Sequence, residues 1–128
     1  MSLTFDSQQG LIIVPVEITG PSGNNAILRL ALDTGATITL INVDVLIAIG
    51  YNPALTSNHI KVTTGSREEL VPSITLSKIL ALGQTHTDFP IIAHTLPASA
   101  GVDGVLGLDF CRGKNLSIDF RNGIINLV

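Results

Sequence analysis

Short runs of branched and aliphatic residues, each bounded by turn-forming residues, recur along the chain and predict strands. Two such runs lie at residues 11–19 and 26–32. The segment between them is a cluster of turn formers, Gly20-Pro21-Ser22-Gly23-Asn24-Asn25. We therefore predict a β-hairpin with a long tip near the start of the chain.

The same pattern continues through the middle of the chain. Residues 60–72 predict two strands joined at Thr64-Gly65-Ser66-Arg67, whose small, polar and charged side chains favour a solvated, mobile tip. Residues 73–82 and 85–94 predict two further strands on either side of Gly83-Gln84. Two hairpins in succession are expected here.

Helical periodicity is confined to a short segment, residues 43–49. Its apolar residues repeat at helical spacing: Val43, Leu46 and Ile47. Asn42 is an acceptable N-cap before it, and Gly50 is a typical stop after it. One short helix is expected at this place.

The last third of the chain predicts a loop at residues 96–104 and an apolar segment at 105–110. Strands follow at 116–120 and 124–128, joined by Arg121-Asn122-Gly123. An Asn-Gly pair between two apolar runs is a strong hairpin signal. The fold is therefore expected to be mainly β.

Composition limits the size and surroundings of this fold. The chain has 128 residues, 45 % of them hydrophobic and 13 % charged, which favours a single folded domain over residues 1–128. The apolar runs fall short of the roughly 20 residues that span a bilayer, so no membrane span is expected. With so few charged residues, part of the surface of this chain must be apolar. Because monomers seldom expose large apolar patches, we expect another subunit to cover it and predict an oligomer.

Charge and cysteine content narrow the class of partners. The net charge is −3 and basic residues form no run, so nucleic acid is not an expected partner. Cys111 is the one cysteine and cannot form an internal disulfide. The start of the chain lacks the features of a signal peptide, and we expect a cytoplasmic location.

The chemistry is expected at Ala31-Leu32-Asp33-Thr34-Gly35-Ala36, which closes the second predicted strand. A strand end presents a side chain rigidly at a surface, and here that side chain is the Asp33 carboxylate. Glycine permits a close approach of another backbone, and the threonine hydroxyl can brace the loop. Taken alone, an Asp-Thr-Gly tripeptide more often forms a simple turn than a catalytic site.

A second segment, Gly104-Val105-Leu106-Gly107-Leu108-Asp109-Phe110, changes this picture. Together the two segments resemble those of the retropepsin-like aspartic proteases, the single-domain relatives of retroviral proteases and of pepsin lobes. The resemblance extends to a flap-like hairpin at residues 60–72 and to the C-terminal hairpin. It implies a closed β-barrel with one or two short helices and one lobe per chain. It also implies that Asp33 is catalytic and that the second segment crosses behind its loop.

Hydrolysis of a peptide bond by carboxylates alone needs one group to take a proton from water and another to donate one. The chain contains a single Asp-Thr-Gly, so the second carboxylate must come from another copy. A two-fold symmetric homodimer would place two Asp33 carboxylates together. We therefore expect an aspartic endopeptidase that activates a water between them.

The resemblance implies roles for the neighbours of Asp33. Thr34, Gly35 and Ala36 would support the active site, with Thr34 bonding across the axis and Gly35 presenting its carbonyl to the substrate. At the flap tip, Thr64, Gly65 and Ser66 would close over an extended peptide or protein substrate. Retroviral members often carry acidic residues where this chain has Thr37 and Ile38, so their contacts with substrate ends do not transfer.

Two other functions remain open at this point. The same fold can serve as a catalytically silent dimerisation or peptide-binding module. The Asp33 segment can also belong to a phosphate-handling loop, although no glycine-rich strand-to-helix loop accompanies it.

Other polar residues have simpler expected roles. We expect Asp109 to form structural hydrogen bonds, Asp103 to belong to a turn and Cys111 to act as a small buried hydrophobic residue. Arg67-Glu68-Glu69 is expected to be a solvated face. The histidines do not repeat at metal-ligand spacing, so no metal or cofactor is expected and they are assigned to the surface or to edge strands: His59, His86 and His94.

Overall fold

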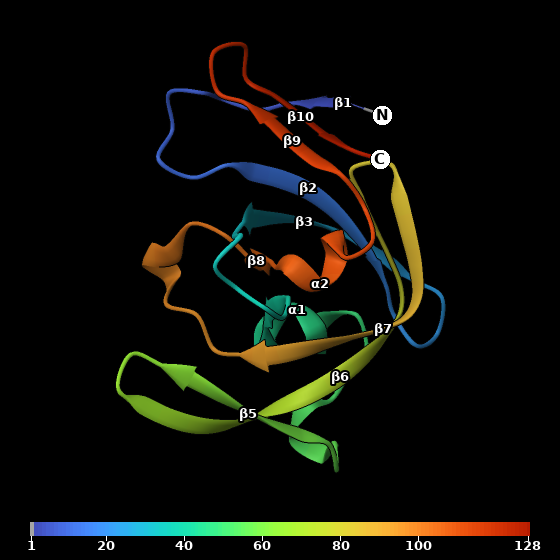
Figure 1. The fold of residues 1–128 in the computed structure, drawn as a ribbon. Coiled ribbons are helices and arrows are strands. Elements are labelled where there is room, and N and C mark those ends of the chain that lie inside the picture. Colours follow the sequence, from blue (N-terminus) through green and yellow to red (C-terminus); the bar gives the residue numbers. More distant parts are fainter. Residues whose placement is uncertain (1) are drawn as a thin grey trace.

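Strands dominate the computed structural model, which describes residues 2–128 apart from the side chain of Thr64 (Figure 1). The strands are β1 (Ser2–Thr4), β2 (Ile13–Thr19), β3 (Asn25–Leu32), β4 (Leu40–Asn42), β5 (His59–Thr64), β6 (Arg67–Ala81), β7 (Gln84–His94), β8 (Gly104–Leu106), β9 (Leu116–Asp119) and β10 (Ile124–Leu127). The helices are α1 (Val43–Ala48) and α2 (Leu108–Cys111), with 3-10 turns η1 (Pro53–Leu55) and η2 (Ala98–Ala100). The mainly β prediction with two short helices is confirmed.

Six strands form a closed barrel in the order β2-β3-β8-β4-β7-β6, because β6 also pairs with β2. Most neighbours are antiparallel, but β3 pairs with β8, and β4 with β7, in parallel. Strand β5 pairs only with β6 among the described residues and so extends beyond the barrel. Closure removes the exposed sheet edges that invite aggregation.

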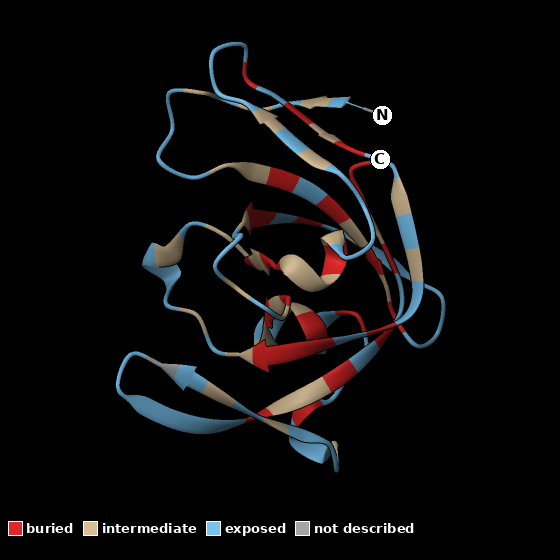
Figure 2. Ribbon diagram, viewed as in Figure 1, coloured by how far each residue is buried: buried red, intermediate tan, exposed pale blue. Residues whose placement is uncertain are grey.

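Alternation along the strands explains why the barrel closes around an apolar core. Val14, Val16 and Ile18 of β2 are fully buried, while Pro15 between them is exposed. This period of two places every second side chain on the inner face. Figure 2 shows the same alternation as buried and exposed bands along β2 and β6. Phe110 of α2 is fully buried in the core as well.

The prediction of a strand boundary between residues 72 and 73 is wrong, because β6 is one continuous strand. Its first part pairs with β5 through Pro72, and its remainder pairs with β7 from Ser73. We call residues 59–72 the flap hairpin. Its strands are largely exposed in Figure 2, and it lies on the same side of the barrel as the segment that follows β3 in Figure 1.

The chain ends form a separate three-stranded sheet in the order β1-β10-β9, beside which both termini lie in Figure 1. The rings of Phe5 and Phe120 meet edge to face at its end, with centroids 6.0 Å apart. The sequence predicted β9 and β10 but neither β1 nor β4. Each of these two strands has three residues, which is too short to show a period.

Helix α1 lies close to its predicted place and Asn42 is its N-cap residue, as predicted, but the Asn42 side chain makes no capping hydrogen bond. The Asn42 side chain instead reaches the loop after β7, with its Oδ1 3.5 Å from the Leu96 nitrogen. Gly50 follows the helix with a φ of +105°, a conformation that favours glycine. Among the residues described here, no helix is long and apolar enough to cross a membrane.

Candidate active site

The backbone of Asp33 is fixed by strands on both sides of β3. Its N–H donates to the Leu106 carbonyl of β8 at 3.0 Å, and the preceding N–H of Leu32 donates to Ile12 at 2.8 Å. Asp33 therefore begins the loop at the end of a paired strand, as the sequence predicted. Its side chain is exposed at the barrel end.

The loop folds back on the carboxylate. The N–H of Gly35 donates to Asp33 Oδ1 at 2.9 Å, and the N–H of Ala36 donates to the Asp33 carbonyl at 3.1 Å. A Cβ at Gly35 would lie 3.2 Å from the same Oδ1, a tight contact. The hydrogen bond from Gly35 orients the Asp33 carboxylate at the end of the strand. Thr34 and Gly35 are exposed, and Ala36 is partly buried.

A buried polar network supports the loop from below. Thr39 is fully buried, and its hydroxyl donates to Asp109 Oδ1 at 2.7 Å while accepting the N–H of Gly107 at 3.1 Å. The N–H of Thr39 donates to Asp109 Oδ2 at 2.9 Å. The predicted structural role of Asp109 is confirmed. Both carboxylate oxygens are used to join the segment after Asp33 to α2.

Gly107 allows this second segment to cross directly behind the loop. A Cβ at Gly107 would lie 2.8 Å from the Ala36 carbonyl oxygen and 2.9 Å from the Ile38 carbonyl carbon. Real Cβ atoms do not approach backbone so closely, so the position requires glycine. The next residue, Leu108, donates its N–H to the Ala36 carbonyl at 2.8 Å. The crossing that the resemblance implied is therefore present.

Asp33 opens onto a cleft of about 790 Å³. The cleft lies between the Asp33 loop, the barrel wall and one arm of the flap hairpin. Its lining residues are Asp33, Gly35, Ala36, Thr37, Ile38, Leu40, Lys61, Val62, Thr63, Ile92, His94, Leu96 and Val105. Asp33 is the one carboxylate among them, in a lining that is otherwise mostly apolar.

The predicted flap residues lie at the turn between β5 and β6. Gly65 and Ser66 are exposed at this tip, whereas the residues that line the cleft come from the arm at 61–63. The backbone of Thr64 ends β5, and its side chain lies outside the part of the chain that the structure describes. The positive φ of +60° at Gly65 suits the tight turn.

Two further polar residues make contacts that the sequence did not predict. Asp103 lies in a bend before β8, which agrees with the expected turn, and its Oδ2 also accepts the N–H of Arg29 of β3 at 2.9 Å. His86 lies on β7 opposite Ile79 of β6, with its ring 4.9 Å from Phe110 and 5.3 Å from Phe89, so it packs against the core. Its Nε2 is buried and has no hydrogen-bond partner among the described residues.

His94 was assigned to the surface or an edge strand but lines the cleft from the end of β7. No spacing in the sequence signals this, because the cleft is assembled from segments far apart in the chain.

Cys111 is partly buried on α2. Burial, and secondarily the charge of Asp109, raise the pKa of its thiol above 9.0. The neutral thiol therefore predominates at neutral pH. This agrees with the expected role as a small hydrophobic residue rather than a reactive group.

Comparison with known proteins gives one family match and a consistent fold. A family model described as aspartyl protease matches residues 14–110. Among curated proteins, none matches the sequence significantly. A retropepsin-like aspartic protease from Rickettsia conorii superposes with a TM-score of 0.74 at 15 % identity, covering 99 % of this chain and 88 % of that one. The retroviral protease-like domain of Ddi1 from Leishmania major gives 0.58 at 17 % identity, covering 94 % and 96 %.

Proposed function

Because this chain belongs to the aspartyl protease family, we propose that it is an aspartic endopeptidase that works as a homodimer. The observation that carries the proposal is the position of Asp33. It is held by β8 and by the N–H of Gly35, and it is the one carboxylate lining the cleft beneath the flap hairpin.

Two Asp33 carboxylates from two copies would complete the chemistry. Two ionised carboxylates close together repel, so the pair retains one proton over a wide pH range. The ionised member takes a proton from a water, and the oxygen of that water attacks the peptide carbonyl carbon. The protonated member donates to the carbonyl oxygen. When the C–N bond breaks, a proton passes to the leaving amine. Because the reaction needs one protonated and one ionised carboxylate, we expect a mildly acidic pH optimum for cleavage.

The single chain offers surfaces that suit a symmetric partner. Thr34 lies exposed beside Asp33, where the resemblance places a hydrogen bond across the dimer axis. In our proposal each copy contributes one Asp33, one Thr34 and one flap hairpin. Such an arrangement is isologous, since the same patch is used on both subunits.

The cleft lining favours an extended peptide as substrate. Val62 of the flap arm faces the same space as Ile92 and Val105 of the barrel. Apolar walls of this kind bind apolar side chains, while the backbone of an extended peptide can bond to strand edges.

The experiment that tests this function is the substitution Asp33→Asn. Asparagine preserves size but cannot exchange a proton with water or substrate, so cleavage of a mixed peptide library should fall by at least about 10²- to 10⁴-fold. Circular dichroism and sedimentation should show an unchanged fold and dimer. The matched control is Asp44→Asn, at an exposed aspartate of α1 outside the cleft, which should cleave normally.

Either of two results would overturn the proposal. Undiminished turnover by the Asp33→Asn variant would place the chemistry elsewhere. Peptide binding by the wild-type dimer without any hydrolysis would identify a silent binding module instead.

A further inference from the structure

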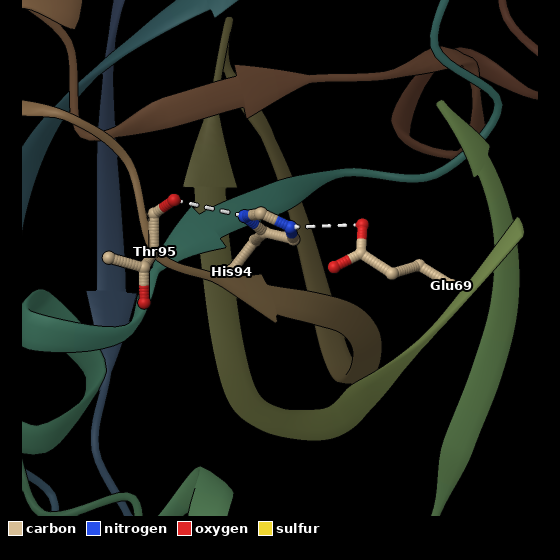
Figure 3. A network of polar contacts seen from close by, with 3 residues as sticks. All are labelled: Glu69, His94 and Thr95. Atoms are coloured by element: carbon tan, nitrogen blue, oxygen red, sulfur yellow. Dashed lines mark hydrogen bonds and ion pairs between the residues drawn. The ribbon is translucent and has the colours of Figure 1, made fainter. Parts of the chain in front are cut away.

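His94 is held between two oxygen atoms at the edge of the cleft (Figure 3). Its Nδ1 lies 3.0 Å from the carbonyl oxygen of Thr95. On the opposite side of the ring, its Nε2 lies 3.6 Å from Oε2 of Glu69. Figure 3 shows the imidazole lying between these two groups, each of which approaches a different ring nitrogen.

The chemistry of these oxygens determines which form of the ring fits. A carbonyl oxygen and an ionised carboxylate only accept hydrogen bonds. Neutral imidazole carries one N–H, so it can serve only one of the two oxygens, and its other nitrogen then presents a lone pair to an acceptor. Only the doubly protonated ring presents an N–H toward both oxygens and carries the charge that makes its 3.6 Å contact with Glu69 an ion pair.

Glu69 and His94 belong to two parts of the fold, the flap hairpin and the barrel, whose backbone pairing to each other begins only at Ser73. Glu69 belongs to the flap hairpin, where it pairs with Val62 of β5. His94 ends β7, which pairs with β6 only from Ser73 onward, and it lines the cleft together with Asp33. The Glu69–His94 contact therefore joins the flap hairpin to the barrel wall beyond the point where their backbone pairing ends.

We propose that His94 is a positioning residue whose protonation holds the flap hairpin against the cleft wall through Glu69. Histidine changes charge in the range of pH 5 to 8. When the ring is doubly protonated, its charge attracts the Glu69 carboxylate and the flap hairpin is held. When the ring is neutral, that attraction is absent and the hold on the flap hairpin weakens. The consequence for catalysis rests on the proposed function, whereas the contact itself does not.

Other titratable or charged groups lie on the elements that meet at this pair, among them the exposed His59 and Arg67 of the flap hairpin. On the flap hairpin, Lys61 lines the cleft and lies 3.5 Å from Glu68 rather than beside Glu69. Asp33 lines the same cleft from the loop after β3. Helix α1, which contacts β7, carries the exposed Asp44. Of these acidic residues, Glu69 is the one that forms the ion pair with His94.

Exposure limits the strength of the contact. The side chains of His94 and Glu69 are 33 % and 49 % exposed, so water and salt screen the pair. Partly exposed pairs of this kind change an equilibrium by about twofold to fivefold. The predicted effect is a graded shift in flap position rather than an absolute switch.

The test follows the flap backbone directly by nuclear magnetic resonance on the full chain. Amide signals of the flap hairpin and imidazole signals of His94 are recorded from pH 5 to pH 8. We expect both sets to follow one common transition. Repeating the titration in the Asp33→Asn variant removes the carboxylate in the cleft and prevents self-cleavage, and the transition should persist there.

Matched variants assign the transition to the pair. Glu69→Gln and His94→Gln each remove one partner at a half-exposed site and should abolish the flap transition. His94→Arg, whose charge is permanent, should give the low-pH flap signals at every pH. Glu68→Gln removes a neighbouring carboxylate paired with Lys61, and it should leave the transition intact.

The proposal fails if the wild-type flap signals do not follow His94. It fails equally if the transition survives in Glu69→Gln or is lost to the same degree in Glu68→Gln. Where peptide cleavage is measurable, His94→Gln should raise KM by about twofold to fivefold at pH 5 with little change in kcat. Absence of cleavage would count against the proposed function alone, because the titration needs no hydrolysis.

Discussion

The hydroxyl of Thr39 is the point where the segment after Asp33 meets the segment at residues 107–109. It lies in the stretch after Asp33, donates to Asp109 of α2 and accepts from Gly107. All of this happens at a fully buried position. Leaving a buried polar group without its hydrogen-bond partner costs more folding free energy than doing so at an exposed site, where water replaces the partner. The hydrogen bonds of the Thr39 hydroxyl should therefore contribute strongly to the stability of the fold.

The substitution Thr39→Val should test that influence. Valine preserves the shape but leaves the Gly107 N–H unpaired and removes one donor from Asp109. We expect the free energy of unfolding to fall by about 2 to 3 kcal/mol, measured by urea denaturation. Thr39→Ser keeps the hydroxyl and loses only a methyl group, worth about 1 kcal/mol. Equal losses in the two variants would contradict the importance of the hydrogen bonds.

At this scale the sequence identified residues that belong to local motifs. Asp33 and Asp109 lie within recognisable segments, and both were placed as expected. The partner of Asp103 and the cleft position of His94 were not predicted, because both depend on distant parts of the chain. The partner of Asp103 is Arg29, 74 positions away. Such pairs arise from the barrel closure and leave no local pattern.

Among the elements, the β9–β10 hairpin shows how a turn is stabilised by one carboxylate. Oδ1 of Asp119 accepts the N–H groups of Arg121 and Asn122 at 3.0 Å each, and its Oδ2 accepts the Asn122 side chain at 2.7 Å. These hydrogen bonds hold the pKa of Asp119 below its ordinary 3.8, and the bond from the Asn122 side chain contributes most. The ionised form is therefore favoured in the folded chain.

This lowered pKa predicts a pH dependence. The hydrogen bonds of ionised Asp119 stabilise the folded chain fully above the ordinary pKa of 3.8 and are lost as pH falls through the lower, folded-state pKa. The stability advantage of the wild type over Asp119→Asn should therefore shrink in acid, as measured by denaturation at several pH values. An advantage that grows in acid would show that the sign is wrong. Asn122→Ala should raise the Asp119 pKa, observed by carboxyl carbon resonances.

The hairpins themselves were the most predictable elements. Turn-forming residues marked the β2–β3 and β9–β10 connections close to their observed places. The continuity of β6 was missed because Pro72 resembles a strand end. Proline lacks an N–H, but Pro72 sits where β6 changes partners, between its pairing with β5 and its pairing with β7.

Seen as a whole molecule, the chain forms one barrel with the exposed Asp33 carboxylate at its cleft. The fold class was predictable because two motifs and the order of the hairpins agreed with a known architecture. The parallel pairings were not, since β4 and β8 have three residues each and pair with strands distant in sequence. Large apolar side chains such as Ile27, Leu70 and Phe120 remain exposed on the single chain.

The proposed dimer makes a quantitative prediction for mixed subunits. If the Asp33→Asn chain exchanges freely with wild type, an equimolar mixture contains about a quarter of dimers with two aspartates. Activity per wild-type chain should then fall to about half. Steady-state cleavage after mixing measures this, and the Asp44→Asn chain is the control that should cause no loss. If the activity per wild-type chain does not change when the Asp33→Asn chain is added, the catalyst is a monomer.

The double use of β6 bears on how related or engineered sequences can vary. Residues 73–81 complete the barrel with β7 and β2, while residues 67–72 belong only to the flap hairpin. Insertions or deletions in the flap arms therefore leave the barrel register untouched. Because side chains alternate along a strand, changes made in multiples of two residues per arm keep the same positions facing the cleft. Exchange of whole flap hairpins of different length is thus a practical way to reshape the cleft on an unaltered barrel.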